Sequence, residues 1–279
     1  MNLYSLNDKI RRRFADAVFW KQCVLSVIAL ALIYFWYSGM MLHHVYDSPF
    51  QYKGSDITYW MFHWLRIPHL VLYNGLTAMV FDILLILSFI SSIAFIDKRG
   101  FTIVSGIFIL VYQVLFNYKI GYPTHHLFGF HFALLPFYFK KDLFQLSVRF
   151  AGILSCLAYA FAGFSKLYHK GWMVYHSFSD ILQSQHAAYF YFHPEALRTK
   201  FCLWMIEHPG MGFTFFLSAM ILQLSFIAGL FTRRYNKLLA LFIVLFHLMD
   251  WWLMNLGVFM GMTVMAWLFL YKEKVVGAS

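Results

Sequence analysis

The chain has 279 residues, of which 61% are hydrophobic and only 12% are charged. Soluble domains carry about 25% charged residues, and this chain lacks the polar surface that would cover its apolar side chains in water. Its net charge of +10 comes from short basic clusters between apolar runs, which argues against a continuous nucleic-acid-binding stripe. We therefore expect an all-α, polytopic transmembrane bundle, with the lipid bilayer as partner and no nucleic acid.

Apolar runs of spanning length recur along the whole chain. A helix needs about 20 residues to cross the hydrocarbon core. The candidate spans are residues 24–42, 71–96, 101–117, 125–139, 150–165, 211–231 and 238–271. The last run is too long for one crossing and is expected to break near 255–257, which predicts about eight spans. The first run is too long for a signal peptide and no cleavage site follows it, so we expect a retained span.

The basic residues predict which way the spans face. If residues 1–22 are cytoplasmic and the spans alternate, fifteen Lys and Arg residues fall inside and seven outside, as the positive-inside rule requires. The inner residues are Lys9, Arg11, Arg12, Arg13, Lys21, Lys98, Arg99, Lys140, Lys141, Arg149, Arg233, Arg234, Lys237, Lys272 and Lys274. The outer residues are Lys53, Arg66, Lys119, Lys166, Lys170, Arg198 and Lys200. Both termini are then cytoplasmic.

The same alternation places nearly all histidines, and the two long connecting segments 43–70 and 166–210, on the outer side. Long ordered loops often carry function, and the inner connections are short, so we expect the functional face to be outside. We expect one transmembrane domain over residues 1–279, in the cell (inner) membrane if the protein is bacterial.

Lys166 closes the fifth predicted span. Helical spacing places the small and polar residues Gly152, Ser155, Tyr159 and Ala162 on the same face as Lys166. Such a face suits contact with other helices or a cavity, where a buried amine loses its proton more easily and acts as a base. The alternative is a lysine that snorkels to the outer interface, beside Trp172 in an aromatic belt.

Other ionisable residues lie in or beside apolar runs, where charge is costly. His125 and His126 open the fourth span, with His131 further in; they suit proton transfer, or are simply polar residues at a helix start. Adjacent histidines point about 100° apart on a helix and do not chelate one metal.

His247 and Asp250 are three residues apart and share a helix face. Asp250 is suited to orient His247 through Nδ1, although a structural hydrogen bond between helices explains the pair equally. Asp82, alone in the second span, needs a partner such as an outer histidine or an arginine, and we expect it to be a structural charge.

Three stretches in order resemble a known family. They are THHLFG at 124–129, FAGFSKL at 161–167 followed by Gly171-Trp172, and FHLMD at 246–250 followed by LGVF at 256–259. Over about residues 118–271 the chain resembles the HTTM domain, the transmembrane region of vitamin K-dependent γ-carboxylase and its bacterial relatives.

The resemblance implies roles for these residues. Lys166 would deprotonate a reduced, vitamin K-like naphthoquinone, His247 would assist with Asp250 beside it, and the active face would be outside or lumenal. His125, His126, His131, Tyr159 and Trp172 are the candidate quinone- or substrate-binding residues. The protein would then be a carboxylase-like, quinol-dependent enzyme that modifies a small or exported peptide.

Departures from the family pattern keep other functions open. Asp250 stands where the family pattern has Asn, and the chain ends at Ser279, so we expect it to lack the family's large lumenal domain and not to be a complete carboxylase. A non-catalytic partner or scaffold in peptide maturation or export, with membrane-associated partner subunits, is the alternative. A metal-dependent membrane hydroxylase or desaturase is disfavoured because HxxHH boxes are missing, and we predict no metal.

Overall fold

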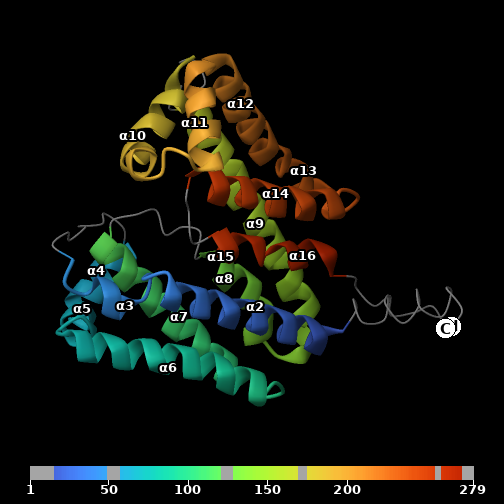
Figure 1. The fold of residues 1–279 in the computed structure, drawn as a ribbon. Coiled ribbons are helices and arrows are strands. Elements are labelled where there is room, and N and C mark those ends of the chain that lie inside the picture. Colours follow the sequence, from blue (N-terminus) through green and yellow to red (C-terminus); the bar gives the residue numbers. More distant parts are fainter. Residues whose placement is uncertain (1–15, 49–56, 121–127, 169–174, 255–258, 272–279) are drawn as a thin grey trace, which may run out of the picture. The chain divides into compact units, whose positions relative to one another are not determined.

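The structure is a computed structural model that describes residues 16–48, 57–120, 128–168, 175–254 and 259–271. Within these ranges every regular element is an α-helix or a 3-10 helix, as the composition predicts (Figure 1). Six helical stretches of this described part are long and apolar enough to cross a membrane. They are Ala17–Val45, Gly75–Ala94, Arg99–Lys119, Lys141–Tyr168, Pro209–Phe231 and Asn236–Leu253. These features support a multi-pass membrane protein.

The other two predicted spans correspond to shorter helices. Residues 125–139 contain α8 (Phe128–Leu134) and the 3-10 helix η2 (Leu135–Tyr138), which has Pro136 in its first turn. A proline interrupts an α-helix because it lacks the N–H and clashes with the preceding turn. The tract 238–271 contains α14 (Asn236–Met254), α15 (Phe259–Thr263) and α16 (Ala266–Leu270), and the predicted break at 255–257 lies outside the described residues. Six stretches of the described chain, not eight, therefore reach spanning length.

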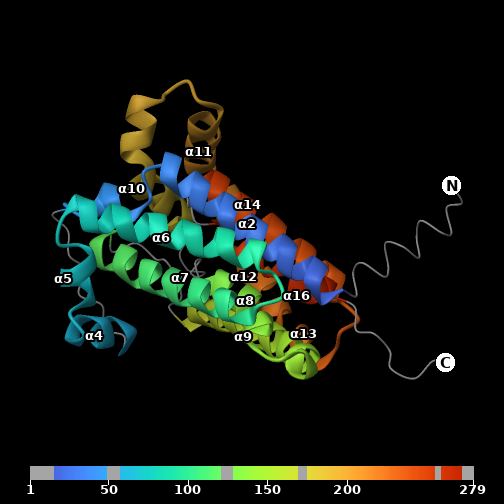
Figure 2. The same cartoon turned by 90° about the horizontal axis from the view of Figure 1, so that it is seen from below.

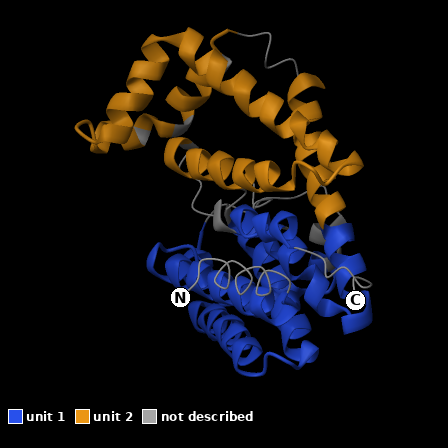
Figure 3. Ribbon diagram, turned by 90° about the vertical axis from the view of Figure 1, so that its right-hand side faces the viewer, with its two compact units in different colours: residues 1–151, 260–279 blue, residues 152–259 orange. Residues whose placement is uncertain are grey.

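The chain divides into two compact units, coloured separately in Figure 3. Unit 1 comprises Met1–Ala151 and Met260–Ser279, and unit 2 comprises Gly152–Phe259. The boundary falls within α9 (Phe144–Tyr168).

Unit 1 is built around three long helices, α2 (Ala17–Tyr37), α6 (Gly75–Ala94) and α7 (Arg99–Ile120), of which α6 packs against both others (Figure 2). Besides α8, η2 and α16, its shorter helices are α3 (Leu42–Val45), α4 (Ile57–Trp64), α5 (Ile67–Val71) and η3 (Lys141–Leu143). Side-chain caps define two helix starts. Asp16 accepts a hydrogen bond from the Val18 N–H, and Asn74 and Thr77 form a capping box at the start of α6.

Unit 2 contains most of α9, followed by α10 (Ser177–Phe192), α11 (Leu197–Glu207), α12 (Pro209–Ser225), α13 (Ile227–Phe231) and α14. Pro209 stands in the first turn of α12, where its missing N–H is not needed. The long segment 166–210, predicted to connect two spans, therefore contains two helices. These helices, α10 and α11, form a hairpin that packs against α12 and α14.

In unit 1, α8 and α15 are far apart in the sequence but lie against each other at Gly129 of α8. A Cβ atom at position 129 would overlap the carbonyl group of Gly261 and would lie 2.7 Å from the Cα of Met262. Trp267 strengthens the same contact, because its Nε1–H donates to the Ala133 carbonyl at 3.2 Å and its ring stacks on Phe137. Glycine is thus required for this close approach of two backbones.

We expect Gly129→Ala to destabilise the protein by about 1–3 kcal/mol, because backbone atoms must move to admit the methyl group. The thermal unfolding midpoint in nanodiscs measures the effect. Gly152→Ala is the matched control, since a Cβ there meets nothing within 4 Å and alanine favours a helix. Equal unfolding midpoints for the wild type and Gly129→Ala would contradict this account of the contact.

Candidate functional site

Tyr159 and Lys166 lie about two turns apart on α9 and so share one face of this helix. Tyr159 is 2% exposed, and its ring stacks on that of Phe226, with 4.3 Å between the ring centroids and 18° between the planes. Phe226 stands at the junction of α12 and α13. This face of α9 is therefore turned toward other helices of unit 2.

Lys166 is tied to α12 by a hydrogen bond. Its Nζ donates to Oε1 of Gln223 at 2.8 Å, and Gln223 is 4% exposed. Gly163, one turn before Lys166, permits the close approach of the two helices, because a Cβ there would lie 2.9 Å from Leu224 side-chain atoms. The amine thus has a buried amide as its partner, and this arrangement differs from a lysine that snorkels into water.

His247 on α14 contacts both Tyr159 and Asp250. Its Nε2 lies 2.5 Å from the Tyr159 hydroxyl oxygen, and its Nδ1 lies 3.8 Å from Oδ2 of Asp250. The second distance is too long for a direct hydrogen bond but within the range of an ion pair. The tautomer that suits both neighbours carries its proton on Nδ1, because that proton then faces the carboxylate while Nε2 accepts from the hydroxyl.

Asp250 also interacts electrostatically with Lys166. When Lys166 is protonated, the ammonium and the carboxylate offset each other's charge, which lowers the cost of holding either at membrane depth. The side chain of Asp250 is 25% exposed, whereas that of His247 is 2% exposed. Asp250 is thus the more accessible of the two α14 groups.

Three helices of unit 2 contribute five polar groups to one region. They are the Tyr159 hydroxyl, the His247 imidazole, the Asp250 carboxylate, the Lys166 amine and the Gln223 amide. In such an arrangement one group can accept a proton while the neighbouring polar groups stabilise the resulting charge. A lysine amine held among packed helices is a suitable general base when it is in its neutral form. We call this set the α9–α12–α14 cluster.

The cluster joins Lys166, His247 and Asp250, which are the predicted catalytic residues, with Tyr159 from the predicted binding residues. The sequence reasoning missed Gln223, which is a member of the cluster, and Phe226, whose ring stacks on that of Tyr159. A signal for Gln223 was present, because it is the only amide side chain in the apolar run 211–231. No comparable signal marks Phe226 among the 33 phenylalanines of the chain.

The remaining predicted binding residues lie elsewhere. His125, His126 and Trp172 fall outside the described residues. His131 belongs to α8 in unit 1. Their roles therefore stay predictions.

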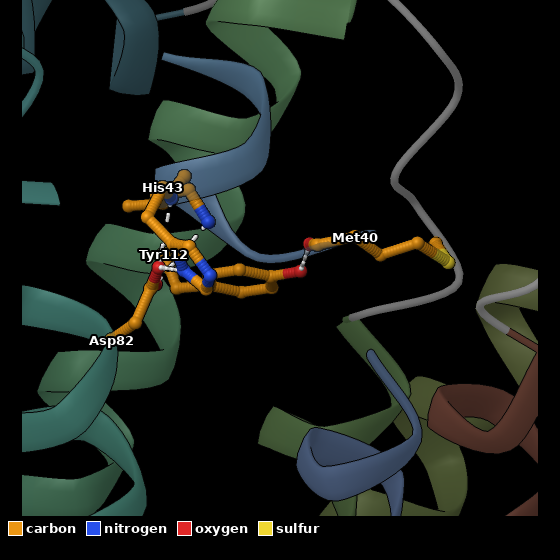
Figure 4. A network of polar contacts seen from close by, with 5 residues as sticks. Met40, His43, Asp82 and Tyr112 are labelled. Carbon is orange, nitrogen blue, oxygen red and sulfur yellow. Dashed lines mark hydrogen bonds and ion pairs between the residues drawn. The ribbon is translucent and has the colours of Figure 1, made fainter. Parts of the chain in front are cut away.

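Asp82 lies in α6 of unit 1 and is fully buried. Its Oδ2 lies 2.8 Å from His43 Nδ1, and the carboxylate accepts backbone N–H bonds from Leu42 at 3.3 Å and His43 at 2.9 Å (Figure 4). Beside it, the Tyr112 hydroxyl donates to the Met40 carbonyl at 2.5 Å. Asp82 thus has a histidine partner of the kind that the sequence predicts, and it holds the start of α3 against α6.

Within the described ranges no three His, Cys, Asp or Glu side chains lie close enough together to hold one metal ion. The donors of the α9–α12–α14 cluster are suited to organic hydroxyl and carbonyl groups. No family model, curated protein or solved structure matches the chain.

Proposed function

We propose that this protein is a multi-pass membrane enzyme in which Lys166 acts as a general base on a quinol-like lipid. The observation that carries the proposal is the hydrogen bond from Lys166 to buried Gln223, with Asp250, His247 and Tyr159 grouped around the same face of α9. An amine held in this way is positioned to take a proton from a bound hydroxyl. The proposed product is a modified small or exported peptide, following the resemblance to the HTTM domain.

The donor set fits a reduced naphthoquinone. Lys166 would take the proton of a quinol hydroxyl, and Asp250 and Gln223 would stabilise the ammonium that results. His247, oriented by the Tyr159 hydroxyl, would hold or pass on a second proton. The quinol itself supplies reducing electrons for oxygen when bound.

The proposal includes an orientation. If the N-terminus is cytoplasmic and the chain also crosses at the shorter segment 125–139, the charge distribution puts Lys166 at the outward end of the fifth of about eight alternating spans. An exported peptide would then reach the α9–α12–α14 cluster from the outer side, in the cell membrane if the protein is bacterial.

The test is oxidation of a reduced naphthoquinone by oxygen in nanodiscs that contain the purified protein. We expect turnover above that of empty nanodiscs, and a decrease of about tenfold in Tyr159→Phe, because His247 loses the group that orients it. Tyr168→Phe is the matched control, since Tyr168 is on the same helix but 82% exposed.

A folded protein without turnover would contradict the enzyme proposal. It would favour the alternative of a non-catalytic partner in peptide maturation, in which the same contacts only join α9, α12 and α14.

A further inference from the structure

The hairpin of α10 and α11 packs on the end of α14 through an apolar cluster. The buried residues of this cluster are Leu182, Cys202, Met205 and Leu253, and the ring of Phe201 lies 4.9 Å from that of Trp252. Leu253 and Trp252 belong to the last turn of α14. The hairpin is therefore in contact with the helix end that follows His247 and Asp250.

Arg198 of α11 forms a hydrogen bond with the last turn of α14. Its Nη2 donates to the Leu253 carbonyl at 3.4 Å, and its guanidinium lies 4.7 Å from the centroid of the Tyr189 ring. A hydrogen bond from a charged guanidinium to a backbone carbonyl is stronger than one from a neutral donor. The ring of Tyr189 in turn limits the positions that the guanidinium can take.

His186 of α10 is a second, neutral donor to the Leu253 backbone. Burial, and then the charge of Arg198, lower the pKa of His186 below its ordinary value of 6.5, while the hydrogen bond to Leu253 opposes this shift. The imidazole therefore remains neutral around pH 7, and Arg198 alone contributes the positive charge at this contact with the helix end.

We infer that Arg198 is a positioning residue: through the Leu253 carbonyl it fixes the last turn of α14 and thereby keeps Asp250 within electrostatic range of Lys166. Asp250 lies three residues before Leu253, so both belong to the same turn, and His247 lies one turn further back. Rotation or fraying of this turn would move the carboxylate away from the amine. The inference rests on the proposed function, because it gives Arg198 a part in the geometry of the same site.

The experiment uses two measurements that need no turnover. In Arg198→Met, hydrogen exchange should become about fivefold faster for the amides of residues 250–254, as expected for the loss of one ordinary hydrogen bond. Acylation of Lys166 by an amine-reactive reagent, followed by peptide mass spectrometry, should accelerate by a similar factor, because an amine released from its carboxylate is more nucleophilic.

Matched variants separate positioning from general destabilisation. Lys200→Met, on the same helix and exposed, should change neither rate. Arg198→Lys should accelerate hydrogen exchange and Lys166 acylation less than Arg198→Met does, because lysine keeps the positive charge. If Arg198→Met fails to fold, Tyr189→Leu should accelerate both rates by a smaller factor.

Faster exchange at 250–254 with unchanged Lys166 labelling would overturn the inference, because Arg198 would then only stabilise the helix end. Unchanged exchange would overturn it as well, whatever the labelling. Absence of quinol oxidation would instead reject the proposed function, and both measurements would still report on Arg198.

Discussion

Replacing Lys166 with alanine is expected to lower the rate of quinol oxidation by about 10²–10⁴-fold, the usual contribution of a general base. The substitution removes the amine that donates to Gln223 and interacts electrostatically with Asp250. It leaves Tyr159 and His247 in contact, so the protein should still fold and bind lipid. The measurement is the initial rate in nanodiscs, compared with the wild type at equal amounts of folded protein.

Lys166→Arg separates a base from a structural cation. A guanidinium keeps the positive charge and hydrogen-bond donors toward Gln223, but it does not lose its proton in proteins. We expect this variant to be about as inactive as Lys166→Ala, while its unfolding midpoint stays closer to that of the wild type. Lys200→Ala should retain full activity, because Lys200 is exposed and paired with Glu195. Substantial turnover by Lys166→Arg would reject the role of the amine as base.

Spanning helices were predictable because hydrophobic length is a property of the local sequence. Of the predicted runs, 24–42, 71–96, 101–117, 150–165 and 211–231 each overlap one of the six long apolar helices, and the sixth lies at the start of 238–271. Residues 125–139 satisfied the same hydrophobic criterion, yet they contain a short α-helix and a 3-10 helix around Pro136. Composition alone therefore overestimated the helix length where a proline interrupts the run.

Helical spacing predicted only which residues of the candidate site share one face of a helix. The pairs Tyr159–Lys166 and His247–Asp250 each share a helix face by spacing, and the structure brings the two pairs together. Gln223 could not be assigned to Lys166 beforehand, because side-chain spacing within α9 does not determine which face of α12 packs against it. That choice depends on tertiary contacts such as the close approach at Gly163.

The second large effect is a loss of stability, which we expect in unit 1 when the fully buried carboxylate of Asp82 is removed. This group accepts three hydrogen bonds, two from the backbone at the start of α3 and one from His43. α3 has no side-chain cap of its own at Met41, so Asp82 acts as its N-terminal cap from another helix. Removal of the carboxylate leaves all three donors without this acceptor in a region closed to water.

We therefore expect Asp82→Ala to destabilise the protein by about 3–5 kcal/mol, because each buried donor left without an acceptor costs about 1–3 kcal/mol. Asp82→Asn should have a smaller effect, because its amide oxygen still accepts a backbone N–H bond. Asp142→Ala is the control, since Asp142 is exposed and should be neutral to stability. The unfolding midpoint in nanodiscs, followed by tryptophan fluorescence, measures all three. If Asp82→Ala unfolds at the temperature of Asp142→Ala, the carboxylate does not hold α3 to α6, and its burial at membrane depth would then point to a chemical role instead.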